Sequence, residues 1–243
     1  MDFRNGIDVM TTETTCLTTI WSTDTTVKDY LELHRRPEAY REMKPGDLAY
    51  YDGAVVVDLD KVESMIAMPF HPSHVYTIKE LNEGGRDLLE EIEKQAVDML
   101  DNKELSLGLA DKYYDGKMHC DQGLIAGCSG GLYENLVAAA HILKGKSIGN
   151  ERFAFSVYPS SHPIYMELMR NGALADLMDA GAVVRSAFCG PCFGAGDTPN
   201  NKGFSVRHTT RNFPNREGSK PGKGQIASVA LMDARSVAAT AAN

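Results

Sequence analysis

The five cysteines of this chain are the residues best suited to metal or redox chemistry, and three of them stand at informative spacings. Cys189 and Cys192 lie in the glycine-rich stretch FCGPCFGAG, and Cys128 precedes Cys189 by 61 residues. A close pair of thiols occurs in redox couples, in halves of zinc sites and in iron–sulfur sites. The sequence therefore points to three kinds of chemistry, with three unrelated thiols as the fourth alternative.

The residues around the close pair argue against the redox and zinc alternatives. A redox couple normally begins a helix whose dipole lowers the thiol pKa, whereas GPCFGAGDTPNNKG, directly after Cys189, is a poor helix former. Structural zinc usually takes two close pairs of ligands, and only one close pair accompanies the separate Cys128. Three cysteines can hold a four-iron cluster whose remaining iron is open to substrate oxygens. Spacing alone leaves all four alternatives open.

The apolar periodicity predicts an α/β fold with a mostly parallel sheet flanked by helices. We expect helices from about residue 27, over 77–105, 133–145 and 162–181 with a break near Gly172, and from Asp233, and strands at 53–60, 122–128, 152–161, 182–188 and 203–210. Sites in open parallel sheets gather at the carboxyl ends of the strands. The segments that follow three of these strands, with Cys128, Cys189 and Thr210, are therefore expected at one edge of the sheet.

Composition and charge describe an ordinary globular chain with an acidic balance. The 243 residues are 43% hydrophobic, and the formal net charge is −8. This charge argues against nucleic acid as a partner, because phosphate binding needs clustered Lys and Arg. No apolar run approaches the ~20 residues of a membrane span, and the N-terminus lacks the pattern of a signal peptide. The odd number of cysteines predicts a reducing, cytoplasmic compartment.

Three segments, in the same order, resemble the aconitase and 3-isopropylmalate dehydratase large-subunit family. IAGCSGGLYENLVAAA is similar to the first cluster segment of that family, CGPCFG to the second, and TTRNFPNREG to its Arg-Asn-Phe-x-x-Arg segment. The resemblance extends over most of the chain, from MTTETT to the final IASVALMDARSVAATAAN. It implies an aconitase-like three-layer α/β/α fold and a hydro-lyase that dehydrates and rehydrates a hydroxy-di- or tricarboxylic acid.

The resemblance also implies roles for individual residues. Cys128, Cys189 and Cys192 match the three protein ligands of a [4Fe-4S] cluster with one open iron. Arg211 and Arg216 match arginines that bind the substrate carboxylate. Arginine suits that task, because its guanidinium pairs with a carboxylate through two parallel hydrogen bonds.

Other positions match the family less closely. Glu13 matches a catalytic glutamate near the open iron, although its segment is also consistent with an acid on a helix surface. Thr210 and Val9 stand where the family usually has asparagine, and CSGG replaces the more common Cys-Thr-Asn-Ser. These departures predict an altered hydrogen-bond shell around the cluster, and hence a divergent hydratase-like member.

The sequence is expected to be a fragment of such an enzyme. Residues 1–79 would belong to its central domain and residues 80–243 to its third domain, with the cluster ligands. The expected partners are a small carboxylic acid and the remaining domains of the parent protein, without which the chain should not turn over substrate. The alternatives are a non-catalytic binding module, which in aconitase-like folds without a cluster can bind RNA, and a pseudo-enzyme with an empty site.

Overall fold

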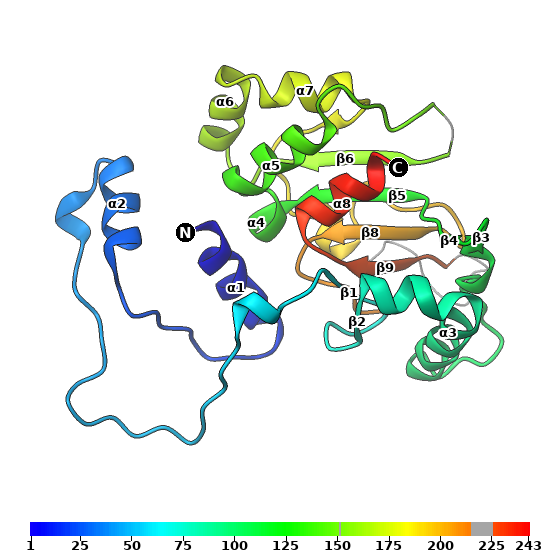
Figure 1. Ribbon diagram of the computed structural model, residues 1–243, viewed down its shortest axis with the longest axis horizontal. Helices are drawn as coiled ribbons and strands as arrows, with labels where there is room; N and C mark the ends of the chain where they lie inside the picture. The colour runs from blue at the N-terminus through cyan, green and yellow to red at the C-terminus, as the bar shows by residue number, and fades with distance from the viewer. Residues whose placement is uncertain (151, 215–225) are drawn as a thin grey trace. The chain divides into compact units, whose positions relative to one another are not determined.

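The computed structural model describes residues 1–150, 152–214 and 226–243, and these residues form two compact units, Met1–Glu63 and Ser64–Asn243. Figure 1 labels their helices and strands. The predicted division between residues 79 and 80 concerns the domains of a parent enzyme and stays a prediction. In the structure, residues 64–79 contribute two strands to the sheet of the second unit.

The first unit is organised by an ion pair between its two α-helices. Arg4 of the first helix binds the carboxylate of Asp24 (Nη1 to Oδ1, 3.1 Å), and the same carboxylate accepts the backbone N–H of Val27 at the start of the second helix (3.1 Å). The hydrogen bond from Arg4 lowers the pKa of Asp24 to about 2. The helix predicted from about residue 27 is therefore confirmed, with Asp24 as its cap. The unit contains α1 (Asp2–Glu13), α2 (Thr25–Leu33), η1 (Pro37–Ala39) and η2 (Leu59–Lys61).

The strand predicted over residues 53–60 is wrong. Its valines are open to solvent, with Val55 90% and Val56 93% exposed, and no strand of the described residues pairs with it. A β-branched run favours a strand only where a neighbouring strand completes its hydrogen bonds and covers its side chains. The end of the run instead forms the single 3-10 turn of η2.

The second unit is built on a seven-stranded sheet in the order β2-β1-β9-β8-β5-β6-β7. The five strands from β9 to β7 in this order run parallel, and β1 and β2 add an antiparallel edge. The predicted fold class, a mostly parallel sheet flanked by helices, is confirmed. The strands are β1 (Met65–Ala67), β2 (Val75–Thr77), β5 (Gln122–Ala126), β6 (Ala154–Tyr158), β7 (Val183–Val184), β8 (Phe204–His208) and β9 (Ser228–Leu231), with a separate hairpin of β3 (Tyr113–Tyr114) and β4 (Lys117–Met118).

Local signals in the sequence set the helix ends. Thr77 and Glu80 form a reciprocal capping box (Glu80 N to Thr77 Oγ1, 3.0 Å), Asp233 caps the last helix, and Gly172 makes the predicted break in a left-handed conformation. The helices are α3 (Ile78–Met99), α4 (Gly127–Gly130), α5 (Tyr133–Leu143), α6 (His162–Arg170), α7 (Ala173–Asp179) and α8 (Ala234–Ala241), with the short 3-10 helices η3 (Ala110–Lys112) and η4 (Gly190–Phe193).

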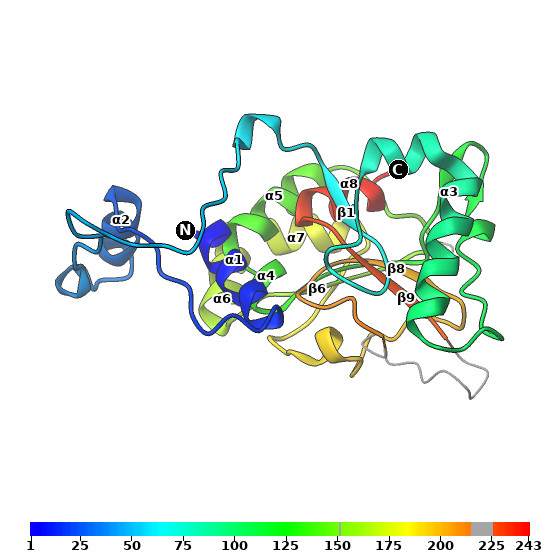
Figure 2. The same cartoon turned by 90° about the horizontal axis from the view of Figure 1, so that it is seen from below.

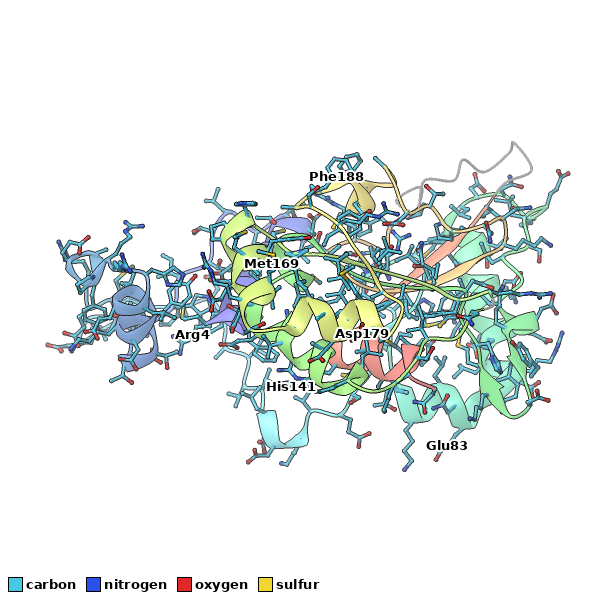
Figure 3. All side chains as sticks on the ribbon, turned by 90° about the horizontal axis from the view of Figure 1, so that it is seen from above. Arg4, Glu83, His141, Met169, Asp179 and Phe188 are labelled. Atoms are coloured by element: carbon cyan, nitrogen blue, oxygen red, sulfur yellow. The ribbon has the colours of Figure 1, made fainter. Side chains whose placement is uncertain are left out.

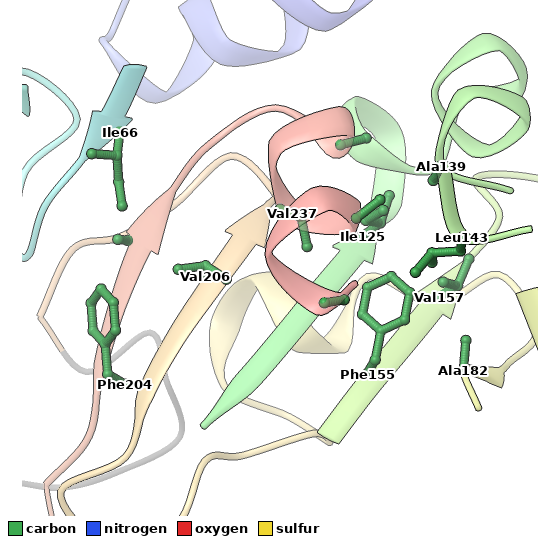
Figure 4. Close-up of a cluster of buried hydrophobic side chains, with 14 of the residues drawn as sticks. Ile66, Ile125, Ala139, Leu143, Phe155, Val157, Ala182, Phe204, Val206 and Val237 are labelled. Atoms are coloured by element: carbon green, nitrogen blue, oxygen red, sulfur yellow. The ribbon is translucent and has the colours of Figure 1, made fainter. Parts of the chain in front are cut away.

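One face of the sheet is apolar and carries the main core. Ile125, Phe155, Val157 and Val206 point from alternate positions of β5, β6 and β8 toward the helices, where they join side chains such as Val237 of α8 (Figure 4). Each fully buried side chain of this size contributes about 1.5–3 kcal/mol to folding. The helices α5, α7 and α8 pack on this face, so the candidate site residues can be sought on the opposite face.

The opposite face carries polar side chains beside a small apolar cluster of Leu124, Ala126 and Tyr158, and the segment 185–203 covers it (Figure 2). The residues that alternate with the apolar ones point this way: Gln122, Ser156, Tyr158, Ser205 and Arg207. Asp197 of the covering segment accepts hydrogen bonds from the hydroxyls of Tyr158 and Ser156, the latter at 3.1 Å. Burial, together with the hydrogen bond to Asp197, raises the pKa of Tyr158 to about 12.

This shift predicts that Tyr158 makes stability depend on pH in alkaline solution. The folded state retains the phenol proton up to about pH 12, whereas the ordinary pKa is 10.0. The stabilisation is therefore complete below pH 10.0 and is lost as the pH rises toward about 12. Urea unfolding at several pH values should show a smaller alkaline loss of stability in Tyr158→Phe than in the wild type. Tyr114→Phe, at a 52% exposed position, should leave that loss unchanged, and equal losses in all three proteins would contradict the prediction.

Candidate metal centre

The candidate site lies at the carboxyl ends of the neighbouring strands β5 and β8. After these two strands, the chain continues toward opposite edges of the sheet. From β5 the chain continues to β6 and β7, and from β8 it continues to β9 on the other side. Ligands of open α/β folds bind at such a switch point, outside the carboxyl ends of the strands. The segments that leave this edge contain Cys128 after β5, Cys189 and Cys192 after β7, and Arg211 after β8. The topology thus brings together the segments that the sequence analysis singled out.

Two glycines allow the turn that carries Cys128 to lie against the strand ends. The strand ends at Ala126, two residues earlier than predicted, and Cys128 stands inside the four-residue helix α4. A Cβ atom on Gly130 would lie 2.0 Å from the backbone oxygen of His208, and one on Gly131 would lie 2.2 Å from that of Tyr158. The glycines of CSGG are therefore required by the close approach of α4 to β8 and β6.

Cys189 and Cys192 occupy a compact loop after β7. The Cys192 amide donates to the Cys189 carbonyl (3.1 Å), and the Ala195 amide donates to the Gly190 carbonyl (2.9 Å), which produces the single turn η4. Phe188 just before the pair projects outward from this loop and is 54% exposed (Figure 3). Cys189 is exposed, whereas Cys192 is buried at 2% exposure. The loop thus presents one thiol to solvent and holds the other against the protein.

The third segment places Thr210 and Arg211 beside the thiols. Burial raises the thiol pKa of Cys192, and hydrogen bonds from the backbone and the side chain of Thr210 partly oppose this rise. The positive charge of Arg211 opposes, as the smallest influence, the raised pKa of both Cys128 and Cys192, so its guanidinium lies within electrostatic reach of each sulfur. Thr210, which stands where the family usually has asparagine, is therefore a hydrogen-bond partner of a predicted ligand.

The three predicted ligands are brought together in the structure. A Cβ atom on Gly127, next to Cys128, would lie 3.5 Å from the sulfur of Cys192. Burial, followed by the charges of Cys192 and Cys189, raises the pKa of Cys128. Burial also raises the pKa of Cys192, and the charge of Cys189 adds to the shift. The thiols of Cys128 and Cys192 therefore resist ionisation on their own and would ionise more readily next to a cationic metal group.

This donor set fits a cluster better than a single metal ion. Within residues 1–150, 152–214 and 226–243, no group of three His, Cys, Asp or Glu side chains gathers closely enough to hold one ion. A cluster distributes its cysteine ligands over different iron atoms, so its thiols need not converge on one point. The arrangement of one buried and two exposed thiols at the mouth of the switch point fits a cluster with an open side. The assignment of the three cysteines as ligands stays a prediction.

Sequence reasoning missed several buried polar residues of the third segment. Asn212, which is fully buried, donates from Nδ2 to the carbonyls of Ala67, Met68 and His71 (3.2, 2.8 and 3.2 Å), so the arginine segment is fastened to the chain after β1. Within the described part of the chain, its Oδ1 has no hydrogen-bond partner. The signal is present in the Arg-Asn-Phe motif, in which only the arginine was assigned a role from the sequence.

His208 joins the turn after β5 to the end of β8. Its Nε2 lies 3.1 Å from the Ser129 hydroxyl, and burial lowers its pKa to about 4, although Asp233 partly opposes this shift. The imidazole is consequently neutral near pH 7. It therefore supports the Cys128 turn by hydrogen bonding and adds no positive charge beside the thiols.

The remaining predicted site residues are not tested by these contacts. Glu13 is the last residue of α1 in the first unit, and its catalytic role stays a prediction. Arg216 lies outside the described residues, so its assignment also stays a prediction.

No helix in the described ranges has the length and apolar character needed to cross a membrane.

Comparisons with known proteins identify the family that the chain resembles. A model of the aconitase family (aconitate hydratase) matches residues 1–239. The chain is 27% identical over 238 residues to the 3-isopropylmalate dehydratase large subunit of Clostridium kluyveri, covering 98% of this chain and 48% of that protein. It is 29% identical over 215 residues to large subunit 1 of the same enzyme from Archaeoglobus fulgidus, covering 88% and 43%. The chain thus spans about half the length of the curated relatives it matches.

The close approach at Gly130 predicts a large effect of one methyl group. In Gly130→Ala the new Cβ would meet the fixed backbone oxygen of His208 at 2.0 Å, so α4 or β8 must move. We expect a loss of about 3 kcal/mol in the free energy of unfolding, measured in urea. Gly53→Ala adds the same methyl where no atom lies within 4 Å and should change stability by less than about 0.5 kcal/mol. Equal stabilities of the two variants would contradict the described approach of α4 to β8.

Proposed function

The chain belongs to the aconitase family, and we propose that it supplies the cluster-holding part of an iron–sulfur-dependent hydro-lyase. The proposed reaction is the dehydration and rehydration of a hydroxy-di- or tricarboxylic acid. The observation that carries the proposal is the meeting of Cys128, Cys189 and Cys192 with Arg211 at the switch point of the sheet. The names of the relatives, 3-isopropylmalate dehydratase large subunits, support this class of substrate.

In this proposal, Cys128, Cys189 and Cys192 hold a [4Fe-4S] cluster. When bound, such a cluster supplies a Lewis acid at the iron that no cysteine holds. Thr210 keeps Cys192 in place through hydrogen bonds to its sulfur. The neutral His208 steadies the turn of Cys128 through Ser129. The protein thereby holds the ligands in position from both sides of the site.

Arg211 binds and orients the acid in the same proposal. Its charge already acts on two of the thiols, so a carboxylate paired with its guanidinium would lie beside the ligand set. Arg216 and Glu13 are proposed to assist, as carboxylate-binding and catalytic residues. We further propose that the base for the carbon-bound proton comes from the remaining domains of the parent enzyme, with which a small companion subunit would associate. The chain alone is then expected to show no turnover.

The cytoplasm stays our proposed compartment. All five cysteines are free in the structure, and thiols that serve as cluster ligands must remain reduced.

Anaerobic reconstitution with ferrous iron and sulfide tests the cluster. The wild-type chain should take up about four irons and gain the broad visible absorption of a [4Fe-4S] group. Cys128→Ser and Cys192→Ser should each lose most of this iron, because each removes one of three ligands. Cys120→Ser is the matched control, since that thiol is largely buried among apolar side chains and its pKa is raised to about 12. No iron uptake by the wild type, or uptake that Cys128→Ser does not reduce, would overturn the proposal in favour of a non-catalytic binding module.

Binding of 3-isopropylmalate to the reconstituted chain tests the role of Arg211. Arg211→Gln should weaken the affinity by about ten- to hundredfold, the range expected when a hydrogen bond between charged partners is lost. Isothermal titration under anaerobic conditions measures this change. Arg170→Gln is the control, because Arg170 pairs with Glu167 of its own helix at 3.3 Å. An unchanged affinity in Arg211→Gln would remove Arg211 from the carboxylate site.

A further inference from the structure

A guanidinium group is buried on the polar face of the sheet, directly beneath the cysteine loop. Arg207, on β8, is only 1% exposed. Its backbone pairs with Leu124 of β5 and with Leu231 of β9, so its position in the centre of the sheet is fixed. An arginine remains charged at every accessible pH and must be surrounded by acceptors when it is buried. The atoms that accept its hydrogen bonds therefore indicate what the residue does.

Those acceptors lie at both ends of the segment 191–197, which contains Cys192 and is called here the loop of Cys192. Nη1 of Arg207 donates to the carbonyl of Pro191, directly before Cys192, at 2.8 Å. Nη2 donates to the carbonyl of Asp197, five residues after Cys192, at 3.2 Å, and to the side chain of Gln122 at 3.0 Å. The planar fork of one side chain thus bridges the two ends of the loop.

The sheet supports this bridge from below. Nε of Arg207 donates to the Ser205 hydroxyl at 2.8 Å, and that hydroxyl donates to Gln122 at 2.6 Å. The amide of Gln122 in turn donates to the Asp197 carbonyl at 2.9 Å. The rotamer of Arg207 is therefore fixed by residues of β5 and β8, and the loop rests on a rigid support.

The carboxylate of Asp197 adds a second attachment and a compensating charge. It accepts hydrogen bonds from Ser156 and Tyr158 of β6, and it lies 3.4 Å from Nε of Arg185. The far end of the loop is thus held to three strands. By contrast, Cys189 at the near end stays exposed.

We propose that Arg207 is a positioning residue that fixes the loop of Cys192 before any cluster binds. Its guanidinium holds Pro191 and Asp197 at a set separation, so the sulfur of Cys192 is presented to Cys128 and Thr210 without rearrangement. The link to cluster assembly rests on the proposed function. The attachment of the loop does not, and it is tested without iron.

Alkylation of the iron-free chain by iodoacetamide, read at each cysteine by mass spectrometry, is the decisive experiment. In Arg207→Met the loop loses its bridge, and the rate at Cys192 should rise about tenfold or more, as expected when a hydrogen bond from a charged donor is lost. The rate at Cys120, which is partly buried against the apolar core on the other face, should not change. The ratio of the Cys192 rate to the Cys120 rate therefore separates release of the loop from general destabilisation, because general destabilisation would raise both rates.

Two further variants complete the test. Val206→Ala truncates the adjacent residue, which points into the apolar core, and should leave the ratio of the Cys192 and Cys120 rates as in the wild type. Arg207→Lys keeps the charge but cannot reach both ends of the loop at once, so it should raise the ratio less than Arg207→Met. If Arg207→Met does not fold, the ratio of the two alkylation rates in Arg207→Lys tests the proposal instead. An unchanged ratio in both arginine variants, or an equal rise in Val206→Ala, would overturn the proposal.

Iron uptake then connects the loop to the cluster. In anaerobic reconstitution, Arg207→Met should take up iron about tenfold more slowly than Val206→Ala, because its ligands are no longer held ready. Equal uptake rates would show that the bridge is irrelevant to assembly and would overturn that part of the proposal. Absence of uptake in the wild type would instead contradict the proposed function, while the alkylation ratio would still report on the loop.

Discussion

The hydrogen bonds between β5 and β8 join two strands whose facing residues, Gln122 and Ser205, are 83 positions apart in the sequence. Their register decides which side chains face the helices and which face the cysteine loop. A slip by one residue would turn Arg207 into the apolar core and Val206 onto the polar face. The same register aligns the turn of Cys128 with the segment of Thr210 and Arg211. The candidate metal centre and the support beneath it therefore depend on one strand pairing.

Much of this arrangement could be predicted from the sequence, because it depends on local signals and on a general property of parallel sheets. The periodicity of 77–105 and the caps at Thr77 and Asp233 are local, and the structure contains the corresponding helices. The placement of Cys128 after a strand follows from the apolar run before it. The rule that sites collect at carboxyl ends then brings the distant cysteines to one edge.

The remainder depended on contacts that no local pattern records. The valines at 55 and 56 have strand propensity, but propensity does not provide a partner strand. The network around Arg207 joins residues of three strands to a loop, and a basic residue in a strand gives no sign that it will be buried. The same holds for Thr210, whose bonds to Cys192 exist only because two distant segments meet. Sequence reasoning thus identified the candidate ligands but not the residues that support them.

The order of these residues along the chain has a consequence for biosynthesis. Cys128, Cys189 and Cys192 all leave the ribosome before Arg207 and Thr210, and β8 can join the sheet only after them. At about 5–20 residues per second, the residues between Cys192 and Arg207 take roughly 1–3 seconds to follow, so all three thiols emerge from the ribosome before their support does. In that interval they are accessible to oxidants and to stray metal ions. In the proposed function, loading with iron therefore follows translation of β8, and the thiols must stay reduced until then.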